Sequence, residues 1–147
     1  MRPRILIFDD NPAVRQLLLT AAERRGYESF TFQDPSFCPL HAKDQCPCES
    51  ATACADIIIS DLDMPNVKGL DFVETLVVNG CRCRHIALMS RSWSAGDIDR
   101  ARRLRCRLFA KPFQIGEVTE WFAEVERTLS PNRGLERAEF LGRPVDT

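Results

Sequence analysis

The chain has 147 residues, of which 44% are apolar and 28% are charged, and its formal net charge at pH 7 is −1. This length suits one domain with a sizeable core and is short for two. The balanced charge gives no reason to expect a nucleic acid or a membrane surface as partner, and no apolar run approaches the ~20 residues of a membrane span. The N-terminus leads straight into a strand-like segment rather than a cleavable signal, so we expect a cytoplasmic protein.

Strand-like and helix-like segments alternate along the chain. Short runs that are apolar or alternating predict five strands, at residues 4–8, 27–32, 56–60, 86–89 and 108–110. Apolar residues at helical spacing, with capping residues before them, predict helices over 12–26, 69–77, 94–104 and 115–129. This alternation is typical of an α/β domain in which helices cover both faces of a parallel sheet.

Charged and polar residues follow four of the five predicted strands: Asp9 and Asp10, Asp61, Ser90, and Lys111. Because the carboxyl ends of parallel strands meet at one edge of a sheet, we expect these side chains to gather there. Three converging carboxylates repel one another and call for a cation, and their oxygen ligands suit Mg²⁺. With a lysine charge and a serine hydroxyl beside them, they could stabilise a transferred phosphoryl group.

This ordered set resembles the receiver domain of bacterial two-component response regulators. The resemblance covers roughly residues 3–129 and rests on these motifs: Asp9-Asp10, Asp61 with Met64-Pro65 and Gly69, Ser90, and Lys111-Pro112-Phe113. It implies the flavodoxin-like receiver fold, a doubly wound five-stranded parallel sheet with strand order 2-1-3-4-5. The receiver domain would span residues 1–130, followed by a C-terminal tail at 131–147.

The resemblance also assigns roles to the acidic residues. Asp61 would be the phosphoacceptor, and Asp10 and Asp61 would bind Mg²⁺ through their carboxylates. The backbone carbonyl of Asp63 would complete the protein ligands, and Asp9 would help mainly through water.

The remaining motif residues would act on the phosphoryl group. Lys111 would hold the phosphoryl oxygens, Ser90 would reorient to bond one of them, and the peptide bond before Pro112 would be cis. Three residues depart from the family pattern. Leu108 stands at the usual aromatic switch position, and Arg91 stands where a small residue is usual. Asp63 places an acid two residues beyond the phosphoacceptor, at a position that tunes dephosphorylation in this family.

A receiver of this kind would take its phosphoryl group from a sensor histidine kinase or a histidine phosphotransfer protein. It would signal by docking to a downstream protein or by passing the phosphoryl group on, with no enzymatic activity beyond its own phosphorylation and hydrolysis. Leu108 and Arg91 leave an alternative open, a metal- or redox-responsive interaction module on a receiver scaffold with impaired switching.

Seven cysteines are unusual for a chain expected to be cytoplasmic. Residues 34–55 form a cysteine-rich insertion in place of the regular second helix, and four of its thiols are candidate Zn²⁺ ligands: Cys38, Cys46, Cys48 and Cys54. Packing and redox chemistry remain alternatives. The other three thiols, Cys81, Cys83 and Cys106, precede the fourth and fifth strands, where they could join Cys54 in a second cluster or serve as small buried apolar residues.

Overall fold

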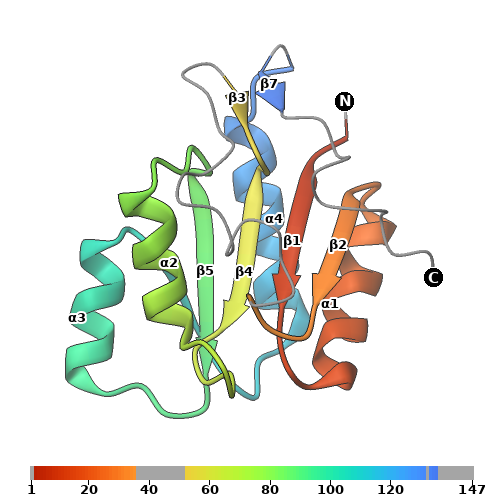
Figure 1. Cartoon of the computed structure of the whole chain (residues 1–147). Helices are drawn as coiled ribbons and strands as arrows, with labels where there is room; N and C mark the ends of the chain where they lie inside the picture. The colour runs from red at the N-terminus through yellow and green to blue at the C-terminus, as the bar shows by residue number, and fades with distance from the viewer. Residues whose placement is uncertain (1, 36–51, 132, 136–147) are drawn as a thin grey trace.

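A parallel sheet forms the centre of the molecule (Figure 1). The structure is a computed structural model, and it describes residues 2–35, 52–131, 133, 134 and 135. The sheet has five strands in the order β2-β1-β4-β5-β6, and every neighbouring pair is parallel. In chain order the strands are β1 (Arg4–Phe8), β2 (Glu28–Phe32), β4 (Ile57–Asp61), β5 (His85–Ser90) and β6 (Arg107–Ala110).

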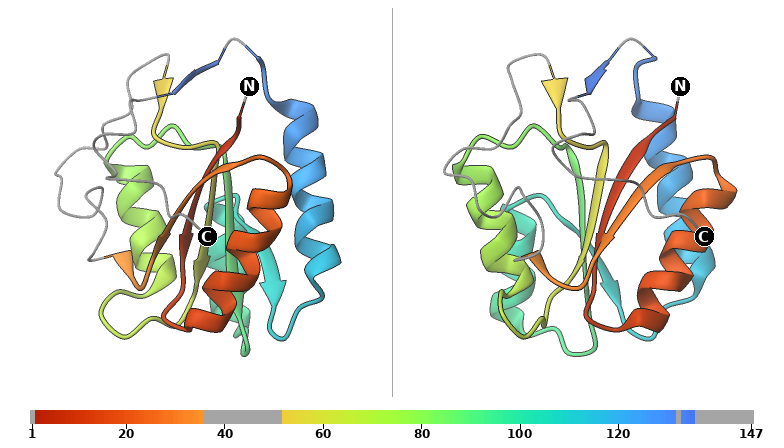
Figure 2. Two further views of the ribbon diagram at one scale, coloured as in Figure 1. Left: turned by 90° about the vertical axis from the view of Figure 1, so that its right-hand side faces the viewer. Right: turned by 45° about the vertical axis from the view of Figure 1, so that its right-hand side comes forward.

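In the part of the chain that the structure describes, four helices cover the two faces of this sheet. They are α1 (Pro12–Arg24), α2 (Gly69–Val78), α3 (Ala95–Arg103) and α4 (Ile115–Thr128). Helices α1 and α4 lie on one face and α2 and α3 on the other, as the turned views in Figure 2 also show. The predicted fold class and strand order, 2-1-3-4-5 among the sheet strands, are therefore confirmed.

The buried strands supply apolar side chains to both faces. In β1, Ile5 and Ile7 pack into the cluster beneath α1 and α4, whereas Leu6 and Phe8 pack beneath α2. All five residues of β1 and of β4 are buried. Because successive side chains of a strand point to opposite faces, a strand covered on both sides must be apolar almost throughout.

Local signals in the sequence set several helix boundaries. The Asn11 side chain accepts a hydrogen bond from the Ala13 amide at 2.9 Å, and Pro12 occupies the first helical position of α1. Gly26 follows the end of α1 with φ +79°, a conformation that costs glycine little. At α3, Ser94 accepts from the Asp97 amide at 3.1 Å.

A small second sheet joins the segment after α4 to the segment before β4. It pairs β3 (Thr52–Ala53) with β7 (Gly134–Leu135) in parallel. Beside it, Arg133 bonds the buried carboxylate of Asp56 through Nε at 2.5 Å and Nη2 at 2.8 Å. The first residues of the predicted tail thus contact the domain, while 36–51 and 136–147 lie outside the described residues. No helix in the described segments is long and apolar enough to cross a membrane.

Candidate functional site

The register of the central strands brings the predicted acids together. Phe8 of β1 pairs with Ser60 of β4, so Asp9 and Asp61, the next residues, lie at the same level of the sheet. Asp61 in turn pairs with Met89 of β5. The site therefore forms at the carboxyl ends of the strands, where their arrowheads point in Figure 1.

The three aspartates form a compact acidic cluster. One carboxylate oxygen from each of Asp9, Asp10 and Asp61 lies within 4.8 Å of the others. Asp9 and Asp61 are buried and Asp10 is exposed. Burial and the charge of Asp9 raise the pKa of Asp61, although Lys111 opposes this shift. Crowded, partly desolvated oxygen ligands of this kind fit a hard divalent cation such as Mg²⁺.

Lys111 connects two of these carboxylates. Its Nζ lies 2.7 Å from Oδ2 of Asp9 and 3.2 Å from Oδ1 of Asp61. Burial by itself would lower the pKa of Lys111. The hydrogen bonds to Asp9 and Asp61 and the charges of these carboxylates outweigh burial, so the pKa of Lys111 is raised. The Lys111 amide donates to the Ser90 carbonyl at 2.8 Å, and the Lys111–Pro112 peptide bond is cis, as predicted.

Ser90 is buried at the end of β5, and its hydroxyl is engaged away from the acidic cluster. Its Oγ lies 3.2 Å from Oδ2 of Asp63 and 3.0 Å from the carbonyl of Ser92, and it accepts from the Ser92 amide at 3.0 Å. The side chain of Asp63 therefore competes for the hydroxyl that the family resemblance assigns to the phosphoryl group.

Gly69 shapes the loop that follows Asp61. Its amide donates to the Leu62 carbonyl at 2.9 Å. A Cβ built on Gly69 would lie only 2.4 Å from the main-chain oxygen of Asp61. The start of α2 can approach the phosphoacceptor candidate this closely only because residue 69 has no side chain.

The aromatic side chains near β6 differ from the family pattern. Leu108 is half-buried on the α2 and α3 side, whereas Phe109 packs on the other face against Trp121, with ring centroids 5.8 Å apart. Trp93, three residues after Ser90, donates from its indole nitrogen to the Phe109 carbonyl at 3.1 Å. Arg91, another departure, is exposed.

Sequence reasoning missed two side chains that border the site. Besides Trp93, Arg15 on α1 donates from Nη1 to the Asp9 carbonyl at 2.6 Å. Only the position of Arg15 one turn after Asn11 placed it near the acids, and that signal is too weak to single out one arginine among many. Trp93 lies in a loop, where periodicity gives no guidance.

The thiols divide into those that the structure describes and those outside it. Cys38, Cys46 and Cys48 lie outside the described residues, so Zn²⁺ binding by the insertion stays a prediction. Cys54 is fully buried before β4, and its Sγ lies 4.0 Å from Sγ of Cys81. All four described cysteines join the hydrophobic cluster beneath α2 and α3: Cys54, Cys81, Cys83 and Cys106.

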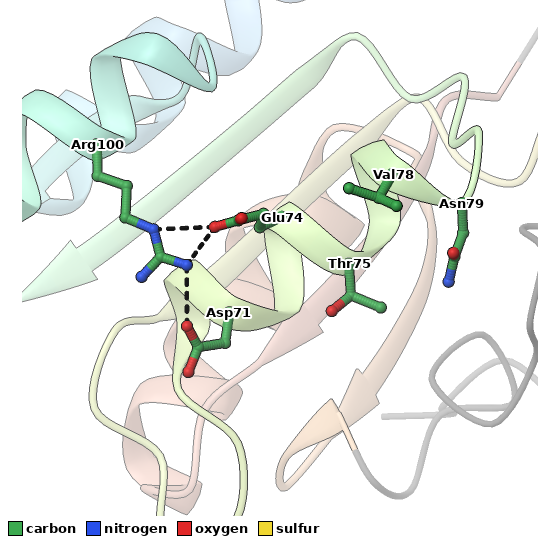
Figure 3. A pocket seen from close by; sticks show the side chains of 6 residues that line it. All are labelled: Asp71, Glu74, Thr75, Val78, Asn79 and Arg100. Carbon is green, nitrogen blue, oxygen red and sulfur yellow. Dashed lines mark hydrogen bonds and ion pairs between the residues drawn. The ribbon is translucent and has the colours of Figure 1, made fainter.

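A pocket of about 310 Å³ lies between α2 and α3 (Figure 3). Arg100 of α3 reaches across it to Asp71, at 2.9 Å, and to Glu74. No residue of the acidic cluster lines this pocket. The phosphoacceptor candidate is therefore part of an open strand edge rather than of this cavity.

The sequence model of the response regulator receiver domain matches residues 5–122. The chain belongs to this family. A receiver domain is a signalling module of two-component systems, and receiver domains interact with histidine kinases or phosphotransfer proteins. The motifs on which the resemblance rested thus led to the correct family.

Known proteins similar to this receiver domain include both regulators and kinases. It is 28% identical over 120 residues to a Picosynechococcus protein named "Probable transcriptional regulatory protein", covering 80% of this chain and 46% of that one. It is 34% identical over 68 residues to the CAI-1 autoinducer sensor kinase/phosphatase CqsS of Vibrio cholerae, covering 46% of this chain and 9% of the kinase. The receiver domain thus spans less than half the length of these curated relatives.

Solved structures agree on the fold. A response regulator receiver protein from Pseudomonas putida aligns with a TM-score of 0.69 at 22% identity, covering 84% of this chain and 98% of that one. A receiver domain from Francisella aligns with the same TM-score at 20% identity, covering 87% and 100%. At such identities the likeness concerns the fold alone.

Proposed function

We propose that this receiver domain accepts a phosphoryl group on Asp61 from a phosphohistidine donor, with Mg²⁺ as cofactor. The observation that carries the proposal is the position of the Asp61 carboxylate, 3.2 Å from Lys111 Nζ and clustered with Asp9 and Asp10 at the strand edge. A buried carboxylate held among like charges, with one lysine beside it, is costly as a structural feature and useful as a phosphoacceptor.

The residues of the site divide the work of transfer. The Asp61 carboxylate forms a bond to phosphorus as the phosphorus–nitrogen bond of the donor breaks, and the imidazole nitrogen keeps that electron pair. Lys111 is placed to hold a phosphoryl oxygen, since its ammonium group already contacts Asp61. Ser90 must give up its contacts with the Asp63 carboxylate and the Ser92 carbonyl before its hydroxyl can donate to the phosphoryl group. Positioning and charge neutralisation supply most of the catalysis in such transfers.

The ligands of Mg²⁺ would be Asp10 and Asp61 with the backbone carbonyl of Asp63, and Asp9 would act mainly through water. The contact of Asp9 with Lys111 at 2.7 Å supports a role for Asp9 in orienting the lysine as well. When bound, the ion neutralises charge on the phosphoryl oxygens and on the crowded carboxylates.

The proposed output is a signal rather than a turnover reaction. The phosphorylated domain docks on a downstream protein or passes its phosphoryl group on, and its only chemistry is its own phosphorylation and hydrolysis. The intact arrangement of Asp61, Lys111 and Ser90 favours this switch over a module that has lost switching.

The test is incubation of the purified protein with Mg²⁺ and either acetyl phosphate or a phosphohistidine donor protein. We expect acid-labile phosphate that disappears in Asp61→Asn and persists in Asp71→Asn, a matched change at an exposed acid of α2. Absence of Asp61-dependent phosphate with both donors would rule out the proposal. Phosphate that forms equally in Asp61→Asn would place the phosphoacceptor elsewhere.

A further inference from the structure

The loop from β5 to α3 follows the serine of the proposed phosphorylation site and carries a half-buried tryptophan. The loop comprises residues 91–94, between Ser90 at the end of β5 and Ala95 at the start of α3. It leaves β5 at the arrowhead end, where the acidic cluster lies (Figure 1). Trp93 packs on the hydrophobic cluster beneath α2 and α3. Any movement of Ser90 towards a phosphoryl group therefore begins in the segment that carries Trp93.

We propose that Trp93 is a positioning residue that holds the Ser90 hydroxyl turned away from the acidic cluster. The inference rests on the proposed function, because it concerns the hydroxyl that would donate to a phosphoryl group on Asp61. Trp93 does not stand at the family's aromatic switch position, which Leu108 occupies. It acts on Ser90 through the backbone of the loop rather than by contact with the reacting atoms.

The first link joins the Ser90 hydroxyl to the backbone of Ser92. Ser90 Oγ accepts from the Ser92 amide at 3.0 Å and lies 3.0 Å from the Ser92 carbonyl. Such a bond from a serine side chain to the backbone two residues later closes a tight turn. The hydroxyl cannot turn to a phosphoryl group while it keeps these contacts. The backbone at Ser92 is therefore released when the Ser90 hydroxyl turns.

The second link joins Trp93 to the neighbouring strand. Its indole Nε1 donates to the Phe109 carbonyl of β6 at 3.1 Å. Strand β6 is a firm support for this bond, because residues 107–110 pair with 87–90 and the Lys111 amide donates to the Ser90 carbonyl at 2.8 Å. The indole bond therefore fixes the path of the loop directly after Ser92. It thereby also stabilises the turn that holds the Ser90 hydroxyl.

A purely structural role would need the ring of Trp93 but not its N–H group. Trp93 directly precedes Ser94, the N-cap of α3, and an apolar residue at this position often packs on the first turn of the helix. Phenylalanine can supply such packing. The indole hydrogen bond to a separate strand is additional, so Trp93→Phe separates the two roles.

The two links predict a reciprocal effect on phosphorylation. If release of Ser92 weakens the indole bond, loss of the indole bond favours release of Ser92 by the same free energy. Trp93→Phe should therefore be labelled by acetyl phosphate with Mg²⁺ up to ~5-fold faster than the wild type, the factor that one ordinary hydrogen bond supports. Trp121→Phe is the matched control, because it makes the same change at a buried tryptophan on the other face of the sheet. It should be labelled at the wild-type rate.

The fluorescence of Trp93 gives a second readout that requires no phosphorylation. The chain has two tryptophans, so Trp121→Phe leaves Trp93 as the sole emitter. In this background, Ser90→Ala removes the hydroxyl that holds Ser92, and we expect Trp93 emission at longer wavelength with stronger quenching by iodide. Ser92→Ala keeps the backbone groups that Ser90 contacts and should leave both quantities unchanged. Phosphorylation of the Trp121→Phe protein should shift the emission in the same direction as Ser90→Ala.

Any of three results would overturn the proposal. The first is a folded Trp93→Phe protein that is labelled at the wild-type rate or more slowly. The second is Trp93 emission and quenching that do not change in Ser90→Ala, and the third is emission that does not change on phosphorylation. If Asp61-dependent phosphate does not form at all, the proposed function fails, and the emission of Ser90→Ala still decides the positioning role of Trp93.

Discussion

The substitution Gly69→Ala tests how tightly the start of α2 is packed against the phosphoacceptor candidate. An alanine Cβ at this position would lie 2.4 Å from the Asp61 main-chain oxygen and 3.0 Å from Leu62 Cα. Real Cβ atoms essentially never come closer than 3.0 Å, and contacts are ordinary from 3.4 Å. The backbone must therefore move by roughly 0.6–1.0 Å, the difference between those limits and 2.4 Å.

Such a movement has little room. Both obstructing groups are main-chain atoms, and the Gly69 amide is held to the Leu62 carbonyl at 2.9 Å. Overpacking in a dense interior costs about 1–3 kcal/mol, and a clash with backbone belongs in the upper part of that range. With ~2–4 °C of melting temperature per kcal/mol for a chain of this size, a cost of ~2–3 kcal/mol lowers the melting temperature by about 4–12 °C.

Gly116→Ala is the matched control, because nothing lies within 4 Å of a Cβ built on Gly116 in α4. Alanine is favoured over glycine in a helix by ~0.5–1 kcal/mol, so this variant should melt about 1–4 °C above the wild type. Thermal unfolding followed by circular dichroism measures both variants. A Gly69→Ala protein that melts at or above the wild type, beside the expected rise in Gly116→Ala, would refute the close approach.

Three further predictions concern the charged and polar groups. The raised pKa of Asp61 means that its carboxylate opposes folding above that pKa, so Asp61→Asn should stabilise the Mg²⁺-free protein against urea at pH 7. This gain should shrink as the pH falls through the raised pKa, and a gain that persists in strong acid would contradict the assignment. Asp63→Ala removes one of the two acceptors near the Ser90 hydroxyl and leaves the Ser92 carbonyl at 3.0 Å. Because the lost bond is worth about 1 kcal/mol, phosphorylation by acetyl phosphate should be faster by at most ~5-fold, and slower labelling would contradict this. Arg133→Ala leaves the buried Asp56 carboxylate without two charge-assisted bonds and should cost about 2 kcal/mol in urea denaturation, whereas an unchanged midpoint would make that contact dispensable.

The sequence determined the elements and the identity of the reactive groups. Apolar runs such as residues 57–59 predict strands, because a strand covered on both faces has no side in contact with solvent. Asn11, Pro12 and Gly26 mark the ends of α1 through local backbone chemistry, and the structure confirms them. Asp61 and Lys111 stood out because each follows such a strand, and strand ends in a parallel sheet share one edge.

Only the tertiary structure decided which groups that are distant in the sequence lie in contact. Three contacts depend on strand register and on the path of the loops: Lys111 with Asp9, the Ser90 hydroxyl with Asp63, and Cys54 with Cys81, whose Sγ atoms are 4.0 Å apart. These distances join residues 27 or more positions apart, and local periodicity holds no information about them. The sequence thus names the phosphoacceptor candidate, whereas the fold decides what must move before that residue can signal.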